Sequence, residues 1–457
     1  MQSGERLLVQ IASYNTNLQA DRGLPQDLVD WLAPTLQVAS FLSQDPRAPD
    51  IVAVGFQELI PLHLGLSGFS KPVIENRNAL ILSQIEQHAP NKEKYSLIAK
   101  VVNVGVALLV YGRDDGVARR VEDVHTQWTG CGPMYMGNKG AVGVRFRVRG
   151  ENDGLGEVYT FVCAHLTAHT NNLARRIADC HHIVGTLLFP PLPGSFSTKP
   201  TTMYSTSHLF FFGDLNFRLT DSLPDPRNLN IQEGQRHKLI KYDQLSRERD
   251  EKGSIFIGLR EGEFWKMKCT YKYQLGEVDQ YDLKRMPAWT DRIMYTTYTD
   301  SPDSPQHSTV TNALYTSIPS YTASDHKPIV SVLLLPPSQP STLSPIPSSS
   351  QITLPSTSTS SLSSRTPLLP QPTPIPLLRL PPTFHPQPDP LANLKKYVGR
   401  TLDRIIGYTW WFFTLLASGP GLLGMISFGL CGWWRWRSAG GGVRLGGNET
   451  SGGPNGV

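Results

Sequence analysis

Residues 206–219 read TSHLFFFGDLNFRL, an apolar and aromatic run that ends in a polar cluster. A short run of this kind, followed by a glycine, is typical of a buried strand. Strands dominate residues 1–335, and helices fall between them without strict alternation, which predicts one domain built as a two-sheet β-sandwich with flanking helices. The other strand-like runs are RLLVQIASYN (6–15), DIVAVGF (50–56), SLIAKVVNVGVALLVYG (96–112), AVGVRFRV (141–148), EVYTFVCAHL (157–166) and PIVSVLLL (328–335). Helix-like stretches cover 26–43, 73–89 and 171–189.

The net charge of +5 is distributed unevenly along the chain. Residues 336–457 contain 9 Lys and Arg against 3 Asp and Glu, whereas residues 1–335 contain 34 against 35. A domain that binds nucleic acid through the phosphate backbone carries a basic surplus, so the composition argues against nucleic acid as a partner. The five cysteines form no CxxC pair, which indicates buried thiols in a reducing compartment and argues against a zinc site.

The composition changes abruptly after residue 335. Residues 336–390 include 16 Pro, 12 Ser and 7 Thr, and such a segment buries too little apolar surface to offset its ordering entropy. We expect a disordered Pro/Ser/Thr-rich linker that acts as a semi-stiff tether. The alternative is a ligand for a proline-reading domain.

A segment without any charged side chain, residues 405–434, follows a basic stretch at 391–404. Its length exceeds the roughly 20 apolar residues of a membrane helix, and tryptophans lie at both of its ends. We expect a single transmembrane anchor, kinked at 418–421, before a short Gly-rich tail at 435–457. A hairpin that returns to the same face of the membrane is the alternative.

Polar clusters follow several of the apolar runs, where a side chain projects from a rigid scaffold into a loop-lined cleft. Each cluster alone has a structural explanation, such as a capped turn or a surface carboxylate, but together they form a set suited to phosphate chemistry. Carboxylate and amide oxygens suit Mg²⁺, a carboxylate accepts a proton from water, and imidazoles donate to phosphate oxygens. The clusters are SYNTN (13–17), GFQE (55–58), AHL (164–166), GDLN (213–216), WTDR (289–292) and SDHKP (324–328).

The order of these motifs resembles the inositol polyphosphate 5-phosphatase family over roughly residues 5–335. GDLNFRL (213–219), PAWTDRI (287–293) and SDHKP carry most of the resemblance, and GNKG (137–140) and TYKY (270–273) support it. The resemblance implies a DNase I-like four-layer α/β sandwich and Mg²⁺-dependent hydrolysis of a phosphate monoester. Within residues 1–335, neither a CX₅R active-thiol motif nor a Walker A motif is found.

The resemblance also implies a role for each matching residue. Glu58 is the expected Mg²⁺ ligand, with Asn17 and Asn15 completing or supporting the site. Asp214 is expected to position and deprotonate the attacking water. The remaining expected catalytic residues are Asn216 on the phosphoryl oxygens, His165 and His326 on the scissile phosphate, Asp291 paired with His326, and Asp325 in the metal-side network. The expected substrate-binding residues are Asn138 and Lys139 for the ring phosphates, and Tyr271, Lys272 and Arg285 for the 4-phosphate.

Two departures from the family pattern concern substrate affinity. Cys269 stands where family members often have a proline, and Leu283 where they tend to have a second basic residue. No catalytic position is lost.

These features together predict a membrane-anchored enzyme that converts phosphatidylinositol 4,5-bisphosphate to phosphatidylinositol 4-phosphate. The layout resembles the fungal 5-phosphatase type with a tail anchor in the endoplasmic reticulum, so we expect a single-pass protein there with a cytosolic catalytic domain. A superfamily nuclease or phosphodiesterase and a membrane-tethered phosphoinositide-binding scaffold are the alternatives. The sequence leaves open the preference among 4,5-bisphosphate, 3,4,5-trisphosphate and soluble inositol phosphates.

Overall fold

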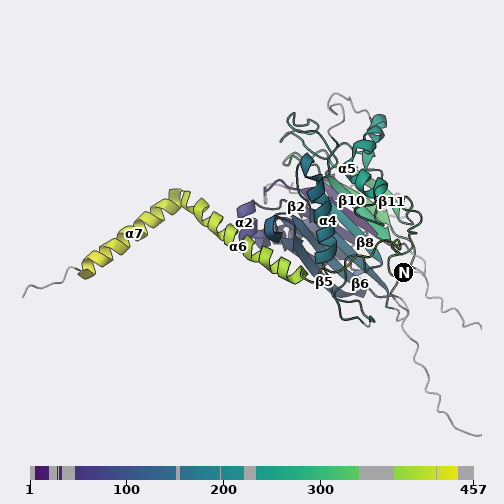
Figure 1. Ribbon diagram of the computed structural model, residues 1–457, viewed down its shortest axis with the longest axis horizontal. Helices are drawn as coiled ribbons and strands as arrows, with labels where there is room; N and C mark the ends of the chain where they lie inside the picture. The colour runs from purple at the N-terminus through teal and green to yellow at the C-terminus, as the bar shows by residue number, and fades with distance from the viewer. Residues whose placement is uncertain are drawn as a thin grey trace, which may run out of the picture. The chain divides into compact units, whose positions relative to one another are not determined.

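The strands of residues 1–335 form two mixed sheets that pack face to face (Figure 1). The computed structural model describes residues 6–19, 28, 30–32, 47–150, 155–195, 197–220, 233–338, 375–417 and 419–440. Within these residues, the first sheet has the order β11-β12-β1-β2-β4-β3 and the second has the order β5-β6-β7-β8-β10-β9.

The bounds of the elements are as follows. The first sheet comprises β1 (Leu8–Asn15), β2 (Ile51–Gln57), β3 (Tyr95–Asn103), β4 (Val106–Arg113), β11 (Thr311–Ser317) and β12 (Ile329–Leu334). The second comprises β5 (Val121–Gly130), β6 (Gly140–Val148), β7 (Glu157–His165), β8 (His208–Asp214), β9 (Arg260–Glu261) and β10 (Asp291–Thr297). The helices are α2 (Leu62–Ser67), α3 (Ser70–His88), α4 (Leu173–Thr186), α5 (Gln244–Ser246), α6 (Ala392–Ala417) and α7 (Gly419–Gly440).

Strand β8 shows how the layers are built. Its alternate side chains point to opposite faces, so Phe210 and Phe212 join the core between the sheets while Leu209 and Phe211 pack with α4. On the far side of the first sheet, α3 contributes apolar side chains to a separate core with β2 and β4. The order helix, sheet, sheet, helix confirms the predicted four-layer α/β sandwich.

The two sheets approach closely at Gly55 in β2. A Cβ atom at this position would lie 2.6 Å from the Phe212 ring and 2.7 Å from Cys163 Sγ. Glycine is therefore required where β2 crosses β7 and β8, just before the strands reach the site described below.

The chain after the second sheet contacts the sandwich again. Residues 339–374, most of the predicted linker, lie outside the described residues, but 375–390 lie against α4 and β8. The Leu378 amide donates to the Thr206 carbonyl at 2.9 Å, and the ring of Phe384 packs edge-on to Tyr204 at 5.1 Å. This stretch differs from the predicted tether because its leucines and Phe384 supply apolar surface that the Pro/Ser-rich part lacks.

The chain divides into two compact units, Met1–Gly407 and Tyr408–Val457. The predicted basic segment 391–404 belongs to the first unit and is helical from Ala392 onward, as the start of α6. The predicted anchor at 405–434 is divided between α6, which ends at Ala417, and α7, which begins at Gly419; residue 418 lies outside the described residues.

The predicted single transmembrane helix is not confirmed. Among the described residues, no helix combines the length and apolar character that a membrane crossing requires.

Candidate active site

The predicted catalytic residues meet where strands of both sheets end. Strands β1 and β2 are parallel, as are β7 and β8, so the carboxyl ends of each pair lie at one edge of their sheet. His165 pairs with Asp214 in the register of β7 and β8, and Asp214 pairs with Asp291 across β8 and β10. Asn15 ends β1, and Glu58 follows β2 directly.

Asp214 lies at the centre of the site and is almost completely buried. Its Oδ2 accepts a 2.9 Å hydrogen bond from Asn15 Nδ2 and lies 3.3 Å from His165 Nε2 and 3.9 Å from His326 Nε2. Its Oδ1 accepts from the amide of Asn216 at 3.0 Å. Burial alone would raise the pKa of Asp214, but His326 and His165 outweigh burial and hold this pKa well below its usual range. Asp214 is therefore an ionised acceptor.

His326 is held in its charged form by Asp291. His326 Nδ1 lies 2.9 Å from Asp291 Oδ2, and the same oxygen accepts from the hydroxyls of Thr270 at 2.7 Å and Thr290 at 2.9 Å. Burial opposes the charge on the imidazole, but Asp291 and Asp214 outweigh burial and raise the pKa of His326 to about 10. Both ring nitrogens therefore act as donors at neutral pH.

Glu58 is the carboxylate of the site that reaches furthest toward solvent, with 28% of its side chain exposed. Its Oε1 lies 3.7 Å from His165 Nε2 and 3.9 Å from Lys139 Nζ, and Lys139 Nζ also contacts His165 Nε2. Burial lowers the pKa of Lys139, and Glu58 and Asp214 oppose that shift.

The donor set fits a hard divalent cation at Glu58. Asp214, Asp291 and His326 offer atoms within 4.8 Å of one another, but a protonated His326 has no lone pair for a metal. Glu58 offers a carboxylate that is open on one side, which leaves positions for water and substrate phosphate, as Mg²⁺ prefers. Asn15 supports this position, because its Oδ1 accepts from the Asn17 amide at 3.0 Å while its Nδ2 donates to Asp214. Asn17 itself is half-buried beside Asn15.

The predicted substrate-binding residues are only partly brought together. Lys139 reaches the catalytic carboxylates, and the half-buried Asn138 precedes it. The Tyr271 ring lies 4.6 Å from the His326 ring. Lys272 Nζ pairs with Asp325 Oδ2 at 2.6 Å, so Asp325 contacts a residue predicted to bind substrate, and its role in the metal-side network stays a prediction.

Arg285 is exposed, on the turn that precedes PAWTDRI. Desolvation and the charge of Arg285 lower the pKa of His169.

Sequence reasoning missed Arg218 as a site residue. Its guanidinium carbon lies 4.2 Å above the Tyr271 ring, and its Nη2 donates to Asn216 Oδ1. Arg218 belongs to the quoted motif GDLNFRL, so a signal was present. Ser324 was missed too: its hydroxyl donates to the Asn15 carbonyl at 2.7 Å and accepts from the His326 amide at 3.1 Å.

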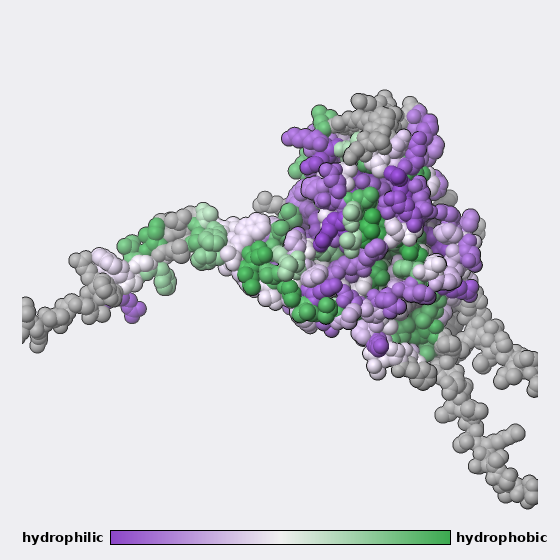
Figure 2. Space-filling view, in the orientation of Figure 1, coloured by the Kyte–Doolittle hydropathy of each residue, from purple (hydrophilic) through white to green (hydrophobic). Residues whose placement is uncertain are grey.

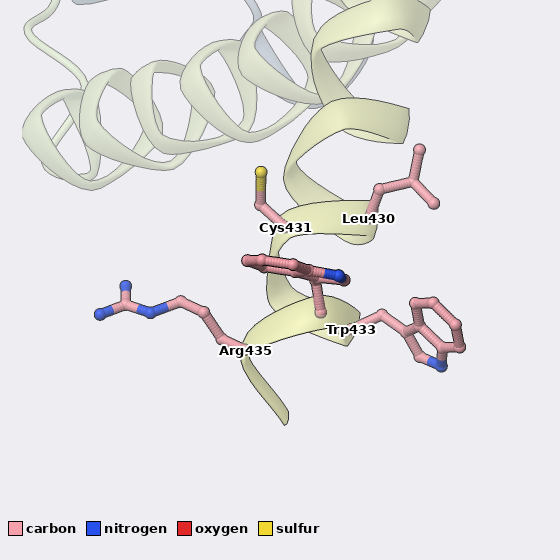
Figure 3. A pocket seen from close by; sticks show the side chains of 5 residues that line it. Leu430, Cys431, Trp433 and Arg435 are labelled. Carbon is pink, nitrogen blue, oxygen red and sulfur yellow. The ribbon is translucent and has the colours of Figure 1, made fainter. Parts of the chain in front are cut away.

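A separate surface hollow lies on α7, in the second unit (Figure 3). All of its lining residues come from one helix, and none of the predicted site residues is among them. The lining residues are Leu430, Cys431, Trp433, Trp434 and Arg435.

Comparison with known proteins agrees with the geometry. The model of the Endonuclease/Exonuclease/phosphatase family 2 matches residues 12–332, and the chain belongs to this family. Its relatives include synaptojanin-2 of Rattus norvegicus, 31% identical over 274 residues that cover 59% of this chain and 17% of that protein. The type II inositol 1,4,5-trisphosphate 5-phosphatase of Mus musculus is 30% identical over 329 residues, which cover 70% of this chain and 29% of that protein. The predicted resemblance is confirmed.

Solved structures show the same fold. The inositol polyphosphate 5-phosphatase domain of a synaptojanin, in complex with inositol (1,4)-bisphosphate and calcium ion, superposes with a TM-score of 0.56 and 25% identity. This match covers 72% of the present chain and 84% of that domain. A Cimex nitrophorin, 18% identical with a TM-score of 0.50, shares the fold alone; the match covers 72% of this chain and 99% of that one.

Proposed function

We propose that this protein hydrolyses the 5-phosphate of phosphatidylinositol 4,5-bisphosphate, giving phosphatidylinositol 4-phosphate and inorganic phosphate. The observation that carries the proposal is the chain of contacts Asp291–His326–Asp214 with Glu58 beside it, at the converging ends of both sheets. Relatives named for 5-phosphatase activity support the reaction class, because they match through the same part of the chain.

Asp214 and the His326–Asp291 pair have different roles in an in-line attack of water on phosphorus. Asp214 is ionised and orients the water as an acceptor. Because its pKa is held low, Asp214 is in the ionised form that can accept a proton from the water. The imidazolium of His326 directs Nε2 at the phosphoryl oxygens, where negative charge must be stabilised, and Asp291 keeps this imidazole charged.

The groups that would hold the inositol ring lie around the catalytic residues. Lys139 supplies a cation close to Glu58 and His165, while Tyr271 and Lys272 lie beside His326 and Asp325. Glu58 would hold Mg²⁺, which when bound polarises the phosphoryl group and neutralises its charge. These placed cations are consistent with a domain whose overall charge is near neutral.

We further propose that the C-terminal helices associate with a membrane, with the catalytic unit in the cytosol and the endoplasmic reticulum as the organelle. Large apolar side chains are exposed on the end of α6 and on α7, and Figure 2 shows apolar surface along both helices. Tryptophans near the ends of such a segment favour the boundary between lipid and water. The exposed residues include Trp410, Phe412, Phe413, Ile426, Phe428, Leu430, Trp433 and Trp434.

Phosphate release from defined vesicles tests the reaction. The full chain is incubated with Mg²⁺ and vesicles containing phosphatidylinositol 4,5-bisphosphate, and phosphate and lipid products are measured. We expect Asp214→Ala to abolish release and Asp115→Ala, which removes an exposed carboxylate, to leave it unchanged. Release that does not depend on Asp214 would refute the proposal, and release from the 4-position would overturn the pocket assignment.

A further inference from the structure

The first half of α6 packs on the catalytic unit through a stripe of three residues. Gly399, Asp403 and Gly407 are spaced four apart and are buried, so they lie on one face of the helix. A Cβ atom at Gly399 would lie 1.9 Å from the Tyr135 carbonyl oxygen, and one at Gly407 would lie 2.4 Å from the Ser67 amide nitrogen. Only glycine allows the helix to come this close to the backbone on which it packs.

Two arginines of α6, next in sequence to Gly399 and Asp403, donate hydrogen bonds to the surface on which the helix packs. Arg400 Nη2 donates to Asn103 Oδ1 at 2.8 Å, and its guanidinium carbon lies 3.9 Å from the Trp128 ring centroid. Arg404 Nη1 donates to the Leu66 carbonyl at 2.6 Å. The packed helix is therefore a specific contact made by hydrogen bonds and close backbone approach.

The Asp403 carboxylate is fully buried and faces the loop between β5 and β6. Its Oδ1 and Oδ2 accept from the Gly137 amide at 3.0 and 3.2 Å. Burying a carboxylate costs free energy unless the carboxylate is hydrogen-bonded. The hydrogen bonds that Asp403 accepts from the backbone amide of this loop offset that cost.

Gly137 lies two residues before Lys139, in the sequence MGNKG. The loop is closed by a 2.7 Å bond from the Cys131 amide to the Lys139 carbonyl, and Lys139 then reaches Glu58 and His165. The contact of Asp403 with Gly137 is thus connected through two peptide units to a cation of the active site.

We propose that Asp403 is a positioning residue for substrate: by holding the Gly137 amide, it fixes the loop that presents Asn138 and Lys139 to the inositol phosphates. This inference rests on the proposed function, because its kinetic test measures phosphatase activity. Residues 392–407 therefore contribute to substrate binding by the catalytic domain, although they lie some 60 residues beyond its last strand, β12.

Steady-state kinetics of the full chain on soluble inositol 1,4,5-trisphosphate test this role without any contribution from membrane binding. Asp403→Ala removes the acceptor, and we expect KM to rise about tenfold while kcat stays within about twofold, since a ring-phosphate contact made in ground and transition state affects KM alone. Asp403→Asn retains an acceptor oxygen and should restore KM to near the wild-type value. Gly399→Ala should act like Asp403→Ala by displacing the helix, and Thr401→Ala, an exposed position on α6, is the matched control.

Amide hydrogen exchange over residues 132–139 provides a second readout that does not depend on activity. Faster exchange in Asp403→Ala and Gly399→Ala, but not in Thr401→Ala, is expected. Unchanged KM in a folded Asp403→Ala that shows faster exchange would overturn the positioning role, and unchanged exchange would overturn the contact. If the wild-type chain releases phosphate neither from this soluble substrate nor from the lipid vesicles, the proposed function fails, and amide exchange then tests the contact by itself.

Discussion

Replacing Asp291 by Asn should make the enzyme sensitive to alkaline pH. The variant removes the carboxylate that lies 2.9 Å from His326 Nδ1 and leaves Asp214, 3.9 Å from Nε2, as the remaining close negative charge. The pKa of His326 is about 10, against 6.5 for an ordinary histidine. Loss of the nearer charge should lower this pKa by about two units, to about 8.

The sign of the effect follows from the charged form being the active one. His326 is protonated below its pKa, so activity is retained below that pH and is lost as pH rises through it. At pH 9 about nine tenths of the wild-type imidazole and about a tenth of the variant's would be charged. We therefore expect kcat/KM of Asp291→Asn to fall about tenfold between pH 7 and pH 9, while the wild type changes little.

The assay measures kcat/KM on soluble inositol 1,4,5-trisphosphate with saturating Mg²⁺ at both pH values. Thr270→Val is the matched control, because it removes a hydrogen bond to Asp291 but keeps the carboxylate charge. If Asp291→Asn showed the same ratio of activities at pH 7 and pH 9 as the wild type, the assignment of His326 as a charged donor would be wrong.

Three further predictions concern the metal, the core and the substrate pocket. Glu58→Gln should weaken Mg²⁺ binding at least about tenfold, measured by calorimetric titration, with activity partly recovered at high Mg²⁺; unchanged affinity would move the metal elsewhere. Gly55→Ala should lower the free energy of unfolding by about 1–3 kcal/mol in urea denaturation, because its methyl group overlaps Phe212; an unchanged midpoint would contradict that close packing. Arg218→Lys should lower kcat/KM about tenfold by losing the stacking on Tyr271 and the bond to Asn216, and equal activity would remove Arg218 from the site.

The central strands were predictable because their signal is local. Apolar runs bounded by turn residues correspond to β1, β2, β6, β7, β8 and β12, and the stretches at 73–89 and 171–189 correspond to α3 and α4. The run at 96–112 proved to be two strands, β3 and β4, joined at Val104, where the backbone φ is 56°. The stretch at 26–43 lies mostly outside the described residues.

Other strands carried too weak a pattern to be recognised. Strand β5 reads VEDVHTQWTG and lies at the edge of its sheet, where Asp123, Val124 and Thr126 are exposed and polar residues interrupt the alternation. Strand β11, also at an edge, is only half-buried along its length. An edge strand gains its conformation from pairing with a neighbour, and that neighbour is distant in sequence.

The sequence by itself determined the fold class and the family and indicated most residues of the candidate site, because motifs at strand ends and apolar periodicity are properties of neighbouring residues. Apart from the expected pair of Asp291 and His326, only the tertiary structure decided which groups touch. It paired Asn15 with Asp214, Lys272 with Asp325, and Asp403 with Gly137, across 199, 53 and 266 positions of sequence. Such contacts depend on how sheets and helices pack, and packing is set by the whole core, so no local pattern around either partner encodes them.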